Sequence, residues 1–390
     1  MKNLLCGGLD GANPLHFLAS LGVLRLLALR DADVGMSWEW RGGWRPEYHW
    51  ICAEAGEPID VAAGYLGAWL RELGSVGKAD ATLDRRIRDL AAALKKLREE
   101  RTALAKEARS AAKNRKLRGD DAKALEIESC AVLDREITEK QILVEELQGE
   151  LNNSLGNGIA HLGDIIGVPA QLFRVKAEAA VAAWLEPVAV TEPCRDHPLL
   201  VVEALAAHAC DVVTDSNGKV QPTPYSFSNG SSGQCLLKDF RGCALNSTDE
   251  MVSGLLRGEP ITSGKVTGLN WNPADQRSYA LQWQDPSSGA DDDPAVNALA
   301  FVGMSLLSAI PVGSNLGAIG WVMARGENGF VWPIWVEAIG LEEVRGLLGI
   351  IPSLAKQPQD IAPMGIHVLM KSARINPTGK RNFFAPANTL

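Results

Sequence analysis

The fold is decided by residues 79–155, which read ADATLDRRIRDLAAALKKLREERTALAKEARSAAKNRKLRGDDAKALEIESCAVLDREITEKQILVEELQGELNNSL. Apolar residues recur at intervals of three and four in the first half, with one break at Arg101. The second half carries its own apolar set, and no proline interrupts either half. A narrow apolar stripe of this kind is typical of helices that pair as in a coiled coil. The stripe consists of Leu83, Ile87, Leu90, Leu94, Leu97 and Leu104, and then of Leu125, Val132, Leu133, Ile137, Val144, Leu147 and Leu151.

The two halves are joined by the short sequence Arg118-Gly119-Asp120-Asp121. Gly119 suits the left-handed position that ends a helix, and the two aspartates suit the start of the next helix. We therefore expect an antiparallel helical hairpin about 50 Å long, since a helix rises by ~1.5 Å per residue.

The two halves carry opposite charge. Residues 85–118 contain thirteen Lys or Arg against four Asp or Glu, whereas residues 120–150 contain ten acids against three bases. One interpretation is a self-complementary hairpin whose charges pair across the seam. The other is a basic face that binds nucleic-acid phosphates and is densest near the tip. The candidate nucleic-acid contacts there are Arg109, Lys113, Arg115, Lys116 and Arg118.

The remainder of the chain predicts an α+β body. Residues 34–51 alternate aromatic and polar side chains around Gly42-Gly43, which is typical of a β-hairpin, and Asn13-Pro14 suits the start of a buried helix. We expect a compact mixed body with short antiparallel strands and buried helices. It is formed by residues 1–78 and 156–390, and the hairpin of residues 79–155 is inserted into it.

Composition restricts the classes of function. The formal net charge of −8 over 390 residues excludes a wholly basic, histone-like binder, so any nucleic-acid contact must be local. Seven scattered cysteines without a CxxC motif favour reduced thiols in the cytoplasm. No apolar run is long enough to span a membrane, and the N-terminus lacks the layout of a signal peptide, so we expect a cytoplasmic protein without a membrane partner.

Two further regions are candidate binding sites. Residues 221–242 combine glycines and small hydroxyl residues that expose backbone N–H groups for an anion, with Lys238 and Arg241 just downstream. A plain flexible loop explains that composition equally well. The tail, residues 367–384, carries Lys371, Arg374, Lys380 and Arg381 and forms either a second basic patch or a solvated terminus. Arg277 is also a candidate contact, although Asp275 is close enough to pair with it.

The sequence contains no recognisable catalytic motif. It has no Walker A loop, no GxGxxG motif, no nucleophile elbow and no nuclease-type triad. The best metal-ligand grouping, His208, Cys210, Cys235 and Cys243, has poor spacing for zinc. We therefore expect a non-catalytic protein without a cofactor or metal, and a hydrolase that uses residues 225–241 is a weaker alternative.

Three stretches of the body resemble a known group of proteins. The stretch LDGANPLHFLASLGVLRL (residues 9–26) is similar to the opening of proteins from type I-G (formerly I-U) CRISPR systems. The stretches YSFSNGSSGQ (225–234) and WNPADQRSYA (271–280) strengthen this resemblance. The group comprises the Cascade large subunit and the related extension of the helicase-nuclease, and the resemblance does not reach the charged hairpin.

The resemblance implies a role in antiviral defence within a crRNA-guided multisubunit complex. Such large subunits contact the double-stranded target DNA next to the protospacer, stabilise the R-loop and recruit the helicase-nuclease. Because guide pairing reads the sequence, the protein needs only phosphate contacts and a short duplex motif. On this basis Asn229, Ser231 and Gln234 are candidate DNA contacts beside Lys238 and Arg241. The competing hypothesis is an adaptor whose hairpin binds another protein and touches neither DNA nor RNA.

Overall fold

The structure is a computed structural model of the chain. It describes residues 2–51, 56–75, 81–154, 200, 203–204, 206–216, 218–227, 236–259, 261–262, 268–273, 293–313, 315–324, 327–356, 361–376 and 382–390. The chain divides into two compact units, Met1–Val76 with Ile159–Leu390 and Gly77–Gly158. We call the first unit the body and the second the hairpin.

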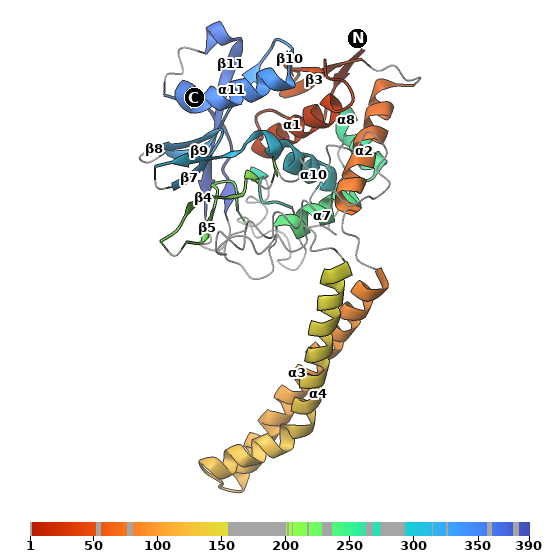
Figure 1. The fold of residues 1–390 in the computed structure, drawn as a ribbon, viewed down its shortest axis with the longest axis vertical. Coiled ribbons are helices and arrows are strands. Elements are labelled where there is room, and N and C mark those ends of the chain that lie inside the picture. Colours follow the sequence, from red (N-terminus) through yellow and green to blue (C-terminus); the bar gives the residue numbers. More distant parts are fainter. Residues whose placement is uncertain are drawn as a thin grey trace. The chain divides into compact units, whose positions relative to one another are not determined.

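The hairpin consists of two long helices, as the sequence predicts. Helix α3 spans Ala81–Asn114 and helix α4 spans Asp120–Ser154 (Figure 1). Ile87 and Leu147 are buried between them, and Leu90 and Leu143 pack against this pair. The apolar periodicity of the sequence therefore forms the seam in this part of the hairpin.

Toward the tip, small residues replace leucine in the seam. The buried side chains there are Ala105, Ala108, Ala112 and Cys130. The expectation that Val132 belongs to the apolar stripe is wrong, because its side chain is 78% exposed. Val132 follows Cys130 by two positions, which is more than half a helical turn, so it lies on the far side of α4 from the seam.

The turn at the tip differs from the prediction. Lys116, not Gly119, ends α3 in the left-handed conformation, with φ of +59°. The Leu117 amide donates to the Ala112 carbonyl (3.0 Å) and the Lys116 amide to the Lys113 carbonyl (3.1 Å), which is a Schellman motif. Gly119 has φ of +58° and accepts from the Lys123 amide, so it precedes α4 instead.

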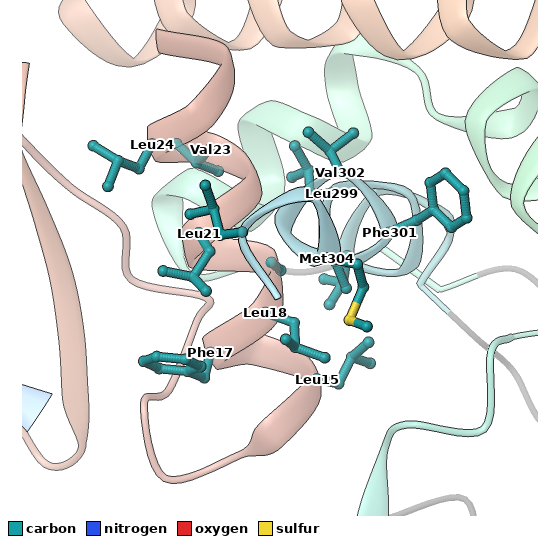
Figure 2. Close-up of a cluster of buried hydrophobic side chains, with 14 of the residues drawn as sticks. Leu15, Phe17, Leu18, Leu21, Val23, Leu24, Leu299, Phe301, Val302 and Met304 are labelled. Carbon is teal, nitrogen blue, oxygen red and sulfur yellow. The ribbon is translucent and has the colours of Figure 1, made fainter. Parts of the chain in front are cut away.

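Helix α1 (Pro14–Ala28) and helix α10 (Pro294–Gly303) cross at the centre of the body. Asn13 caps α1 by accepting from the Leu15 amide, and Pro14 occupies its first turn, as predicted. The crossing is close because Gly22 and Gly303 lie at it: a Cβ on either would collide with a carbonyl oxygen of the other helix. Figure 2 shows Leu15 and Leu18 of α1 pointing toward Met304, which follows α10.

Two antiparallel sheets flank these helices. The first has the order β1-β3-β2-β10, where β1 is Lys2–Leu5, β2 is Gly35–Trp40, β3 is Trp44–Trp50 and β10 is Ile339–Gly340. The second has the order β12-β11-β9-β8, with β13 also paired to β11. Its strands are β8 (Trp321–Ala324), β9 (Glu327–Trp335), β11 (Ile366–Ile375), β12 (Phe383–Phe384) and β13 (Asn388–Thr389).

The remaining described elements are short hairpins and surrounding helices. Strands β4 and β5 pair with each other, as do β6 and β7, and helix α2 packs against α7 and α8 (Figure 1). The strands are β4 (Ala209–Thr214), β5 (Val220–Pro222), β6 (Ala309–Val312) and β7 (Asn315–Ala318). The helices are α2 (Pro58–Ser75), α7 (Leu236–Asn246), α8 (Asp249–Arg257), α11 (Leu341–Leu354) and the 3-10 turns η3 (Met304–Leu306) and η5 (Ala362–Met364).

Aromatic side chains join the two sheets through α1. The Phe17 ring stacks on Trp38 of β2 at 5.8 Å and tilts against Trp332 of β9 at 5.7 Å. The indole nitrogen of Trp332 donates to the Gly11 carbonyl, and that of Trp335 donates to the Met36 carbonyl, both at 2.7 Å. These contacts form the centre of a large hydrophobic core.

Two regions that the sequence places at the surface contribute to the sheet and the core of the body. Ile366–Ile375 forms β11 at the middle of the second sheet, so this part of the tail is not a solvated terminus. In the expected loop of residues 221–242, Tyr225 and Phe227 are buried. Both depend on pairing partners far away in the sequence.

The architecture is α+β with a long antiparallel helical hairpin, which confirms the predicted fold class. Among the described residues, no helix combines the length and the apolar character that crossing a membrane requires.

Candidate nucleic-acid interface

Four predicted cations lie at the tip of the hairpin. Lys113 is in the last turn of α3, and Arg115, Lys116 and Arg118 follow in the turn. All four side chains are exposed, and no ion pair engages any of them within the part of the chain that the structure describes. The Schellman turn projects these charges together over six residues.

Acids of α4 pair with two arginines of α3 instead. Nε of Arg101 lies 2.9 Å from Oδ1 of Asp134, which explains why the break in the apolar stripe is tolerated. The fifth predicted contact, Arg109, binds both carboxylate oxygens of Glu126 at 2.7 Å. This hydrogen bonding raises the pKa of the Arg109 guanidinium and lowers the pKa of Glu126. The structure therefore separates Arg109 from the four exposed tip cations.

The outer surface of α3 carries further exposed cations. Arg85, Arg86, Lys95 and Lys106 are exposed, and none of them forms an ion pair with another described residue. Lys96 pairs with Glu100 along the same helix, and Arg98 donates to Gln141 of α4. The four exposed cations belong to the charge run in the sequence, but nothing in that run distinguishes them from the paired ones.

The charges at the tip also stabilise the helix ends. Lys113 lies in the last turn of α3, where a cation interacts favourably with the helix dipole, and Asp120 and Asp121 lie in the first turn of α4. A structural role thus accounts for part of this pattern. Arg118 lies between the helices, beyond the last turn of α3, so the dipole explains it less well.

The predicted cations of the body are used within the fold. Nε of Arg241 in α7 donates to the Gly74 carbonyl at 3.2 Å. Arg374 of β11 donates to the Pro224 carbonyl at 3.1 Å and lies over the Phe227 ring, and burial lowers its pKa. Lys371 is half-buried on the same strand. These three residues do not form an exposed basic patch.

Other predicted contacts lie outside the described residues or side chains. Lys238 lies in α7, and its side chain is outside the described set. The predicted contacts outside the described residues are Asn229, Ser231, Gln234, Arg277, Lys380 and Arg381.

Described residues of the stretches 9–26, 225–234 and 271–280 contact one another in the body. The side chain of Asn13 donates to Oδ1 of Asn272 at 3.1 Å, which joins the first stretch to the third. The indole nitrogen of Trp271 donates to the Tyr225 carbonyl at 3.2 Å, which joins the third to the second. Trp271 and Tyr225 are buried, so these described contacts hold the core together.

The best metal-ligand grouping does not assemble among the described residues. His208 lies parallel to the Trp271 ring at 5.4 Å, and burial lowers its pKa to about 3. Cys235 is outside the described residues. No group of three or more His, Cys, Asp or Glu in the described ranges could hold a metal ion.

A scan against protein-family models finds no match, and a search of curated proteins finds none either.

Proposed function

We propose that the protein binds nucleic acid through the tip of its hairpin, without catalysis, as a subunit of an RNA-guided surveillance complex. The observation that carries this proposal is the division of charge in the hairpin. Acids of α4 engage Arg101 and Arg109, whereas Lys113, Arg115, Lys116 and Arg118 stay exposed together at the tip.

Exposed lysine and arginine clusters suit a phosphate backbone. A phosphate contact needs only a positive charge within reach, and each contact releases counterions from the polyanion. The formal net charge of −8 would repel nucleic acid over most of the surface, so contacts with duplex phosphates would be local, at the tip and the outer surface of α3.

The assignment to a surveillance complex rests on the resemblance of the body. In such a complex the guide RNA reads the target by base pairing, and the protein contributes phosphate contacts and recognition of a short duplex motif. The tip would contact target duplex next to the protospacer and stabilise the R-loop, and the helicase-nuclease would be recruited to the complex.

A protein adaptor is the second candidate function. Ile127, Val132 and Ile142 of α4 are 67%, 78% and 51% exposed, so α4 presents large apolar side chains outside its seam. A partner helix that covered them would use the hairpin without any contact to nucleic acid.

Filter binding of duplex DNA at two salt concentrations separates these functions. Replacing Lys113, Arg115, Lys116 and Arg118 with glutamine should reduce the slope of log affinity against log salt by about 3 to 4, because each duplex phosphate contact contributes ~0.9. The matched control replaces Arg85, Arg86, Lys95 and Lys106, which removes the same charge from the shaft of α3 and should have the smaller effect.

Glutamine is chosen because glutamate at the end of α3 would also oppose the helix dipole. Far-ultraviolet circular dichroism checks that both variants keep their helices. Unchanged affinity and slope in the tip variant would refute the tip as the DNA contact and favour the adaptor.

A further inference from the structure

The end of the β2–β3 hairpin presents an exposed tryptophan. Trp40 is the last residue of β2, and its side chain is 63% exposed. It pairs in register with Trp44, the first residue of β3. Gly42 between them has φ of +67°, a conformation that favours glycine, so the turn is tight and leaves the indole at the surface.

Trp40 is held in place by its neighbours. Its ring meets the Trp44 ring edge to face at 5.2 Å, and Trp44 tilts against His367 of β11 at 4.9 Å. The Trp44 amide donates to Oδ1 of Asp10 at 3.2 Å, and the Trp44 carbonyl accepts from the Gly11 amide at 2.7 Å. The supporting ring is therefore fixed from both its backbone and its side chain.

The residues beside Trp40 are polar or lack a side chain. Glu39 and Arg41 form an exposed ion pair at 2.9 Å, and Gly42 and Gly43 follow. A Cβ on Gly42 would meet nothing within 4 Å, so the approach to the turn is open. The turn thus offers an exposed indole and an exposed guanidinium that is paired with Glu39, with open space at Gly42 and the Asp10 carboxylate beside Gly43.

We propose that Trp40 stacks on an unpaired base of single-stranded nucleic acid while Arg41 faces the adjoining phosphate. This inference rests on the proposed nucleic-acid function and names a second contact, in the body, that recognises bases rather than duplex phosphates. Stacking of a base on an aromatic side chain tolerates any sequence, because every base has a π-face.

The surroundings of Trp40 favour a base over an apolar side chain of a protein partner. Protein hot spots lie in desolvated pockets that are ringed by other contacts. The described neighbours of Trp40 along the strand are instead a charged pair and two glycines. A base needs access to the indole, which is 63% exposed, and the exposed Arg41 guanidinium beside it is paired with Glu39.

Fluorescence anisotropy of a short labelled single strand tests the stacking. An otherwise identical strand with abasic positions keeps the phosphates but removes the bases. Trp40→Ala should weaken binding of the complete strand about tenfold, within the range measured for base–aromatic stacking, and leave the abasic strand unchanged. Trp40→Phe should retain most of the affinity, and Met323→Ala, which removes another exposed apolar side chain, should change nothing.

A second variant tests the role of Arg41. Arg41→Gln removes the guanidinium that faces the phosphate, so affinity should fall about two- to fivefold and the salt slope should flatten by ~0.7, the value for one single-strand phosphate. Both measurements are repeated with the glutamine variant of the tip. A Trp40 effect that persists there supports base stacking even if the tip contact fails.

Two results would overturn the inference. Equal loss on complete and abasic strands in Trp40→Ala would mean that no base stacks on the ring. Unchanged binding of the complete strand in Trp40→Ala, with the salt slope of the tip intact, would mean that Trp40 does not contact the strand and would leave the proposed function standing.

Discussion

Among the described residues, the buried imidazole of His208 has no hydrogen-bond partner for its ring. It lies between Trp271 at 5.4 Å and Phe301 at 6.1 Å, nearly parallel to both rings. Neither ring nitrogen has a hydrogen-bond partner among the described residues, whereas Nδ1 of His16 accepts from the Asp10 amide. A buried polar group without a partner costs stability, and a charged one costs more.

This placement makes stability depend on pH. Burial lowers the pKa of His208 to about 3 and that of His16 to about 4, both below the ordinary value of 6.5. The unfolded chain therefore binds protons that the folded chain excludes, and stability is lost as the pH falls below 6.5. Each such histidine lowers the free energy of unfolding by up to about 1.4 kcal/mol for every pH unit that the pH falls in that window.

His208→Phe should remove one titrating group, so the free energy of unfolding should depend less steeply on pH. The phenyl ring would keep the stack with Trp271 and Phe301. Urea unfolding between pH 7 and pH 5 measures the change in slope, and the absolute stability at pH 7 need not be the same. An unaltered slope in His208→Phe would show that His208 is already protonated or solvated in the native protein.

At the scale of elements, the turn of the hairpin places a lysine in a backbone conformation that favours glycine. Lys116 adopts a left-handed backbone that disfavours every residue with a Cβ except asparagine and aspartate. Glycine is the usual residue at this position of a Schellman motif. A lysine there contributes charge to the tip at the expense of helix stability, which is common where a residue serves binding.

Lys116→Gly should therefore stabilise the hairpin and weaken its contact with nucleic acid. We expect a gain of about 0.5–1 kcal/mol, because the strain relieved exceeds the entropy that glycine adds to the unfolded chain. Arg115→Gly removes the same charge from an adjacent position with ordinary φ, so it should weaken binding without any gain. Thermal unfolding followed by far-ultraviolet circular dichroism compares the two, and equal stabilities would contradict the strain.

The hairpin was predictable because its signal is local. The apolar period of Ile87, Leu90 and Leu94 predicts the helices directly, and no proline competes with it. The end of α3 was not predictable in this way, because Gly119 is the best left-handed residue in the turn and yet the helix ends three residues earlier. Which arginines pair also depends on how α3 and α4 align across the seam, and the charge run does not reveal that.

The body was predicted less completely because its contacts are distant in sequence. Strand β11 is central through pairing with β9, β12 and β13, while its own sequence resembles a basic tail. Tyr225 is buried because its hydroxyl reaches the Ile319 carbonyl, 94 residues away. The sequence therefore pointed to the tip cations as a candidate site, and only the structure identified Trp40 as exposed.

At the scale of the whole molecule, tryptophan fluorescence reports on the body and not on the hairpin. All eleven tryptophans lie outside residues 77–158, and the body has its own large core. Replacing residues 77–158 with a short glycine-serine linker should leave tryptophan emission and near-ultraviolet dichroism unchanged, since closing a loop costs little extra as its length changes.

The same deletion variant should lose the steep salt dependence of duplex binding and keep the interaction of Trp40 with single strands. A red-shifted tryptophan emission in this variant would show that the body cannot fold without the hairpin. In that case the loss of duplex binding would carry no information about the tip.

The crossing of α1 and α10 has a consequence for synthesis on the ribosome. Helix α1 is apolar around most of its circumference, yet Leu299 and Gly303, which meet its Gly22, are translated only after three quarters of the chain has emerged. The hairpin can close early from neighbouring contacts, whereas α1 must wait with its leucines uncovered. Nascent chains stalled before α10 should therefore be the ones that chaperones retain.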